Sequence, residues 1–208
     1  MMKVLIQNLQ KRPGLATKLY EEHKPNILMV QELNYHTERS GLFPAKNLIG
    51  IGKSGYGTAI GSEYTIAKIK KVIAPYPEIG GLIRKRTTIA TIKGVQWISM
   101  HAYNGQPFKD KHKLVAHIEA VLNKLEPGPA VFAGDFNTWS KVHLDAVKET
   151  VEKVGFRHVY SWPYNGRDLP LDHVFIRGDI RGDIRVKKAE NFVSPSDHRG
   201  AILELEML

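Results

Sequence analysis

The 208-residue sequence contains no cysteine, which excludes disulfides, thiolate metal sites and a cysteine nucleophile. Any metal ion must therefore be held by oxygen and nitrogen ligands. No apolar run approaches the ~18 residues needed to cross a bilayer, and the opening MMKVLIQNLQKRPG lacks the long apolar region and cleavage site of a secretion signal. We therefore expect a cytoplasmic protein without a membrane-spanning segment.

Acidic residues are also scarce, because 21 Asp and Glu stand against 30 Lys and Arg and leave a formal net charge of +9. A basic excess of this size favours a polyanionic partner, such as nucleic acid or an anionic lipid headgroup. A solvated basic surface without any partner explains the same excess equally well. Composition alone leaves both interpretations open.

The pattern of apolar residues predicts helices that alternate with short strands. Helices are expected between Pro13 and Pro25, between Asp110 and Leu125, and before Gly155. Strands are expected at residues 2–9, 27–30, 48–51, 57–61, 65–74, 82–92, 95–100, 130–133, 172–177, 184–189 and 201–207. The tandem Arg-Gly-Asp-Ile repeat at residues 177–184 is interpreted as a polar turn. We predict one α/β domain over residues 1–208, with two packed sheets and outer helices.

Polar residues suited to binding metal or phosphate follow several of these strands. Glu32 follows ILMVQ, His101 follows WISM, and Asp135 and Asn137 follow AVFAG. Strand ends are where open α/β folds build their sites. In an extended chain Asp135 and Asn137 point the same way, although Asn137 taken alone is better explained as the cap of the helix that follows. Repetition at several strand ends favours one shared site.

A second group of polar residues lies near the C-terminus. Asp197 and His198 stand just before the last strand, and Asp172 opens the strand-like segment DHVFIR. If Asp172 meets His198 in the fold, the carboxylate fixes the imidazole tautomer and stabilises the imidazolium. His173 alternates with Asp172, so we expect it to face the opposite side and to be structural.

Together these motifs resemble the endonuclease/exonuclease/phosphatase family, which has the deoxyribonuclease I-like fold. The resemblance runs from about residue 3 to 206 and rests on Asn8 in IQNLQ, Glu32 in VQEL, His101 and Asn104 in SMHAYN, Asp135 and Asn137 in GDFN, Asp172 in LDHVF, and Asp197-His198 in SDH. It implies a four-layer α/β sandwich, in which two central, mostly antiparallel β-sheets are flanked by helices. It also implies a phosphoesterase site at one edge of the sandwich.

The resemblance implies that Glu32 is the principal ligand of Mg²⁺ or Mn²⁺, that Asn8 orients this site, and that Asp197 contributes to it. An oxygen-rich ligand set without cysteine suits these ions better than zinc. Four carboxylates in one pocket, counting Asp135 and Asp172, would repel each other and an incoming phosphate unless a cation intervened. A bound ion would polarise the phosphoryl oxygen and acidify a bound water.

The resemblance also implies catalytic roles. Asp135 would position or deprotonate the attacking water, and Asn137 would stabilise the charge that develops on the phosphoryl group. His198, oriented by Asp172, would bind the phosphate or act as a base. His101 would contact the phosphate or assist the leaving oxygen.

Residues that contact the substrate are less sharply indicated. The resemblance implies that Asn104 is one of them. Alternation along the predicted strand at residues 82–92 places Arg84 and Arg86 on one face and Lys85 on the other. The two arginines are candidate contacts to backbone phosphates, and a solvated edge strand is the alternative.

Two departures from the family pattern bear on the substrate. Gln10 gives no support for a second metal ligand at its position, and the segment between Asn137 and Asp172 is shorter than in repair nucleases. We therefore predict an endonuclease or exonuclease of low selectivity, with DNA favoured over RNA, acting as a monomer without an obligate protein partner. Trp139 and Trp162 either line the cleft or belong to the core. A small-molecule or lipid-headgroup phosphoesterase and a non-catalytic nucleic-acid-binding relative are the alternatives.

Overall fold

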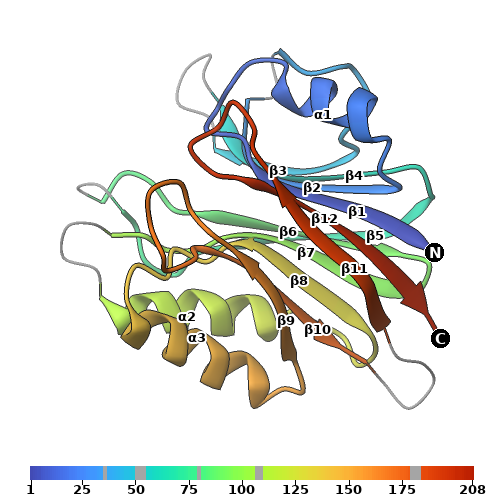
Figure 1. Ribbon diagram of the computed structural model, residues 1–208. Helices are drawn as coiled ribbons and strands as arrows, with labels where there is room; N and C mark the ends of the chain where they lie inside the picture. Colours follow the sequence, from blue (N-terminus) through green and yellow to red (C-terminus); the bar gives the residue numbers. More distant parts are fainter. Residues whose placement is uncertain (35–36, 50–54, 79–80, 106–109, 179–183) are drawn as a thin grey trace.

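The computed structural model describes residues 1–34, 37–49, 55–78, 81–105, 110–178 and 184–208. Two six-stranded sheets pack face to face and helices cover their outer faces, as Figure 1 shows. This arrangement confirms the predicted four-layer α/β sandwich. The end of the strand expected at residues 48–51 and most of the Arg-Gly-Asp-Ile repeat lie outside the described residues. No helix in the described part of the chain is long and apolar enough to cross a membrane.

The first sheet contains the first and last strands of the chain. Its spatial order is β11 (Ile184–Phe192), β12 (Gly200–Met207), β1 (Met2–Asn8), β2 (Ile27–Asn34), β4 (Tyr56–Ser62) and β3 (Ala45–Ile49). Strands β1 and β2 run parallel because helix α1 (Leu15–His23) carries the chain back between them. The other neighbouring pairs of this sheet are antiparallel. Leu15 and Leu19 of α1 pack on its outer face.

The second sheet is built in the same way around one parallel pair. Its spatial order is β5 (Ile66–Ile73), β6 (Arg86–Ile92), β7 (Val95–His101), β8 (Ala130–Asp135), β10 (Asp172–Arg177) and β9 (Arg157–Trp162). Helix α2 (Lys111–Leu122) connects the parallel strands β7 and β8. Helix α3 (Lys141–Glu152) packs beside α2, and both cover the outer face of this sheet (Figure 1).

Apolar side chains fill the space between the two sheets. Val4 and Ile6 of the first sheet share one buried cluster with Trp97 and Val131 of the second. Every second residue of these strands faces inward, because successive side chains of a strand alternate between its two faces. Burial of this apolar surface holds the sheets together.

Both parallel pairs end at the same edge of the sandwich. Asn8 of β1 is paired in register with Gln31 of β2, and His101 of β7 with Asp135 of β8. Asp172 of β10 is in turn paired with Asp135. This edge lies at the opposite end of the strands from the two chain termini in Figure 1. The fold therefore gathers polar residues from distant parts of the sequence.

Two strands differ most from the expectations. Strand β6 begins at Arg86 rather than at Leu82, and just before it the backbone N–H of Ala74 donates to the carbonyl of Lys85 at 2.9 Å. Strand β9 has no counterpart among the predicted strands. Its segment RHVYSW shows no clear alternation, and only Trp162 in it is fully buried, so periodicity gave no signal.

Candidate active site

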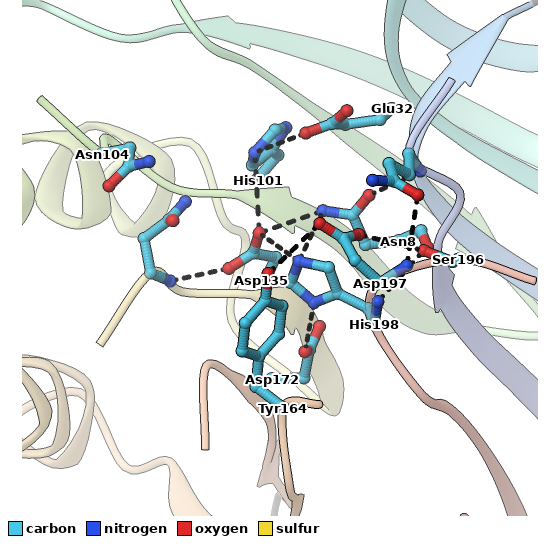
Figure 2. A network of polar contacts seen from close by, with 12 residues as sticks. Asn8, Glu32, His101, Asn104, Asp135, Tyr164, Asp172, Ser196, Asp197 and His198 are labelled. Atoms are coloured by element: carbon cyan, nitrogen blue, oxygen red, sulfur yellow. Dashed lines mark hydrogen bonds and ion pairs between the residues drawn. The ribbon is translucent and has the colours of Figure 1, made fainter. Parts of the chain in front are cut away.

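Four buried side chains form the centre of the polar edge, as Figure 2 shows. Asp172 Oδ2 lies 2.7 Å from His198 Nδ1, and Asn8 Nδ2 donates to Asp135 Oδ2 at 3.0 Å. His198 Nε2 lies 3.7 Å from Asp135 Oδ2, so the imidazole stands between the two carboxylates. The side chains of His198, Asp135 and Asp172 are 8%, 3% and 1% exposed. The structure thus brings together residues of β1, β8, β10 and the loop before β12.

The charges in this cluster compensate one another. Burial alone would lower the pKa of His198, but Asp172 and Asp135 outweigh burial and raise the pKa to about 10. Burial raises the pKa of the Asp135 carboxyl, and the His198 charge offsets part of that rise. For Asp172 and Asp135 the intervening cation expected from the sequence is the imidazolium of His198, which lies between the two carboxylates.

Asp135 and Asn137 are placed by a tight turn at the end of β8. The backbone N–H of Asn137 donates to Asp135 Oδ1 at 2.8 Å, which is an Asx turn, and Asn137 adopts a left-handed φ of +52°. The expected extended geometry is thus wrong here. The capping alternative is also wrong, because Ser140 caps α3 by accepting from the N–H of His143. Asn137 Nδ2 instead donates to the carbonyl of Ala102 at 3.0 Å.

A β-bulge places Glu32 at the same edge. The register between β2 and β4 shifts between Val30 and Leu33, and Glu32 has a φ of +52°. Bulges re-aim side chains: Gln31 points inward and donates to Ser99 Oγ, whereas Glu32 Oε1 lies 3.7 Å from His101 Nε2. Such a strained conformation in a residue other than glycine costs about 1–3 kcal/mol and clusters at functional sites.

The loop before β12 is tied to the end of β1. Ser196 Oγ donates to the carbonyl of Asn8 at 2.7 Å, and the N–H of Asp197 donates to Gln10 Oε1 at 3.2 Å. Tyr164 Oη donates to Asp197 Oδ2 at 3.2 Å, and its ring packs against the ring of His198 at 4.7 Å. Gln10 therefore positions Asp197, and Tyr164 is a neighbour that sequence reasoning missed.

The three basic residues at positions 84–86 are not placed as the alternation pattern predicts. Arg84 is exposed and precedes the strand, while Arg86 is half-buried and donates from Nη1 to Asn47 Oδ1 at 3.4 Å. No contact among the described residues joins either arginine to the acidic cluster. Lys85, assigned by alternation to the opposite face, instead reaches His101 Nε2 with its Nζ at 2.7 Å. All three residues of this Arg-Lys-Arg segment are charged, so the sequence pattern does not indicate which of them is buried.

The two tryptophans lie in different parts of the structure. Trp162 is a core residue, 1% exposed. Trp139 is half-buried at the site, where its Nε1 donates to Asn104 Oδ1 at 2.8 Å and to Asn137 Oδ1 at 3.1 Å. Arg167 stacks on its ring at 4.8 Å. His173, as expected, faces away from the site and lies 2.8 Å from Thr138 Oγ1 through its Nε2.

The described residues offer one carboxylate that suits a metal ion. Within the described ranges, no group of three or more His, Asp or Glu side chains is arranged to hold one. Glu32 nevertheless has the right chemistry, because its carboxylate is 23% exposed and accepts no hydrogen bond from a described residue. Mg²⁺ commonly binds one or two carboxylates and completes its shell with water and substrate phosphate. The residues therefore fit an ion held mainly by Glu32.

Comparison with known proteins agrees with this arrangement. The sequence profile of the Endonuclease/Exonuclease/phosphatase family matches residues 7–198, a stretch that contains every residue of the cluster. The chain belongs to this family. Its members are hydrolytic phosphoesterases that are typically dependent on a divalent metal.

The chain is similar to several known proteins in sequence or in structure. It is 40% identical over 116 residues to a UPF0294 protein of Vibrio vulnificus, a match that covers 53% of this chain and 39% of that protein. An endonuclease/exonuclease/phosphatase family protein from Leptotrichia buccalis has a TM-score of 0.73 at 17% identity, covering 99% of this chain and 100% of the other. The endonuclease domain of TRAS1, a telomere-specific non-LTR retrotransposon, has a TM-score of 0.67 at 19% identity, covering 97% and 96%. These structural likenesses show the shared fold.

Proposed function

We propose that this chain is a divalent-metal-dependent phosphodiesterase that hydrolyses nucleic acid. The observation that carries the proposal is the cluster in which His198 stands between Asp172 and Asp135 while Asn8 donates to Asp135. The cluster combines a cationic donor for a phosphate oxygen with a carboxylate suited to take a proton from water. A positioned base and a charged hydrogen-bond donor each lower the barrier to phosphoester hydrolysis.

In the proposed mechanism, Asp135 accepts a proton from the attacking water, and Asn8 holds its carboxylate in place through the 3.0 Å hydrogen bond. The raised pKa of Asp135 favours this role, because a base works best when its pKa approaches the working pH. Protonated His198, fixed by Asp172, donates from Nε2 to a phosphate oxygen. Asn137 stabilises the charge that develops on the phosphoryl group.

Glu32 is the proposed principal ligand of Mg²⁺ or Mn²⁺, with Asn8 and Asp197 as its supporting residues. When bound, the ion would polarise the phosphoryl oxygen and lower the pKa of a coordinated water. His101 lies beside Glu32 and Asp135, which suits a contact to the phosphate or to the leaving oxygen.

A nucleic-acid substrate is supported by the net charge of +9, since a basic protein concentrates polyanions. The short segment between Asn137 and Asp172 supports low selectivity, and DNA remains favoured over RNA. A small phosphoester is the alternative substrate in this family. Arg84 remains a candidate contact to backbone phosphates outside the acidic cluster, because its side chain is exposed.

The direct test incubates the protein with supercoiled DNA, single-stranded DNA, RNA and bis(4-nitrophenyl) phosphate in Mg²⁺, Mn²⁺ or EDTA. We expect cleavage of a nucleic acid with either ion and none in EDTA. The Asp135→Asn variant should lose activity, whereas Asp145→Asn, which alters an exposed carboxylate paired with Lys141, should keep it. Cleavage that survives EDTA, or activity restricted to small phosphoesters, would overturn the proposal.

A further inference from the structure

Lys85 is a buried lysine beside the candidate active site. Its side chain is 9% exposed, and its Nζ lies 2.7 Å from Nε2 and 3.4 Å from Nδ1 of His101. Contact with both nitrogens places the ammonium group against the ring of His101 rather than in line with the lone pair of one nitrogen. Lys85 thereby limits how far this ring can move.

The position of this ring matters for two carboxylates. Asp135 Oδ2 and Glu32 Oε1 lie 3.6 and 3.7 Å from His101 Nε2. A shift of the ring would therefore change its distance to the proposed base and to the proposed metal ligand together.

Glu78 is the buried counterpart of Lys85. Its side chain is 6% exposed, and its Oε2 lies 3.7 Å from Lys85 Nζ. The backbone N–H of Asn104 donates to Glu78 Oε1. Backbone bonds between Glu78 and Ile83 close the turn that sets the two charged side chains beside the end of β7.

A buried ion pair adds little to the free energy of folding, because the cost of desolvating both charges offsets their attraction. Apolar residues of similar volume would fill the same space at no such cost. Here each partner instead makes one contact to a residue of the site, His101 or Asn104. Asn104 in turn receives the Nε1–H of Trp139.

We propose that Lys85 and Glu78 are positioning residues of the active site, in which Lys85 holds the His101 ring in place and Glu78 holds Lys85 and Asn104. The inference rests on the proposed function, because it assigns both residues to the same reaction. Lys85 acts here through His101, whereas Arg84 stays a candidate contact to backbone phosphates.

The test compares Lys85→Met, Lys85→Arg, Glu78→Gln and the double variant Lys85→Met/Glu78→Gln, with bis(4-nitrophenyl) phosphate as the substrate. We expect Lys85→Met to lower kcat by about 100-fold with KM changed little, since misplacing a catalytic group costs that much. Lys85→Arg should recover part of the rate. Lys187→Met is the matched control, because Lys187 forms a more exposed ion pair with Glu206 at the far end of β12.

The double variant separates positioning from folding. Lys85→Met alone leaves Glu78 buried without its partner and should lower Tm by about 10 °C. Removing the Glu78 charge as well should restore most of the Tm but not kcat. Recovery of both Tm and kcat in the double variant would show that the pair is only structural and would overturn the proposal.

A second readout does not depend on turnover. In ¹⁵N-histidine-labelled protein, the ring signals of His101, assigned by their loss in His101→Gln, should shift in Lys85→Met and stay unchanged in Lys187→Met. Unchanged His101 signals in Lys85→Met overturn the proposal, whereas the expected shift in a protein inactive on every phosphoester overturns the proposed function and leaves the Lys85 contact standing.

Discussion

Two histidines flank the same oxygen of Asp135, and their surroundings favour the charged form of one and the neutral form of the other. His198 Nε2 lies 3.7 Å and His101 Nε2 lies 3.6 Å from Asp135 Oδ2. Asp172 and Asp135 overcome burial and raise the pKa of His198 to about 10, whereas burial and then Lys85 hold the pKa of His101 well below its ordinary value. One side of the site therefore carries a cation and the other a neutral ring.

The difference shows that the neighbours of a buried histidine determine its charge. A carboxylate behind one imidazole stabilises its charged form, and an ammonium beside the other stabilises its neutral form. A phosphate entering between them would meet a cationic donor on one side and a neutral imidazole on the other. The following predictions break or sharpen this asymmetry, beginning with the largest effect.

Asp172→Asn breaks the charged side. The amide cannot stabilise the imidazolium of His198, so the pKa of His198 should fall and the ring should lose its fixed tautomer. We expect kcat to drop on the order of 10³-fold, measured with bis(4-nitrophenyl) phosphate. Asp145→Asn is the control, since Asp145 is exposed on α3. A rate near that of the wild type would contradict the assigned role of Asp172.

The pH dependence of stability sharpens the comparison. The folded-state pKa of His198 is raised to about 10, so its stabilising contribution is complete below about pH 6.5 and is lost as pH rises towards 10. Burial, and then Lys85, lowers the pKa of His117 to about 3, so that contribution is lost as pH falls from about 6.5 towards 3. Each effect should reach on the order of a few kcal/mol.

Thermal unfolding from pH 4 to pH 10 measures both limbs. We expect Tm to peak near neutral pH. His198→Gln should flatten the alkaline limb and leave the acid limb in place, because His117 is untouched. An alkaline limb that keeps its slope in this variant would refute the charged state assigned to His198.

Ser196→Ala should have the smallest effect. The hydroxyl donates to the carbonyl of Asn8 and accepts from the N–H of His198 at 3.2 Å. Its loss should cost about 1–2 kcal/mol and lower Tm by about 4 °C, with kcat reduced less than tenfold. A loss of activity as large as that of Asp172→Asn would show that this loop governs the charged side more strongly than Asp172 does.

The layers of the fold could be predicted because they depend on local patterns. Alternation in β1 and the apolar spacing of α2 reflect burial of one face, which the sequence carries directly. Strand β9 was missed because its residues are partly exposed on an edge. The start of β6 was predicted too early because the apolar pair Leu82 and Ile83 resembles the beginning of a strand, whereas Leu82 is exposed in the structure.

For the candidate site, too, some features could be predicted from the sequence and others could not. The order of Asn8, Glu32, His101, Asp135 and His198 at strand ends was visible in the sequence, and the structure gathers them at one edge. The contact of Lys85 with His101 was not visible. Two polar residues sixteen positions apart acquire a contact only when β6 and β7 pair in one register.

The sequence by itself determined which chemical groups this protein carries and that they follow buried strands. Only the tertiary structure decided which carboxylate meets which histidine, and that Lys85 rather than Arg84 or Arg86 enters the site. The physical reason is that charge and tautomer depend on partners within a few ångströms. Asn8 and Asp135, 127 positions apart, become partners only through the register and packing of two complete sheets.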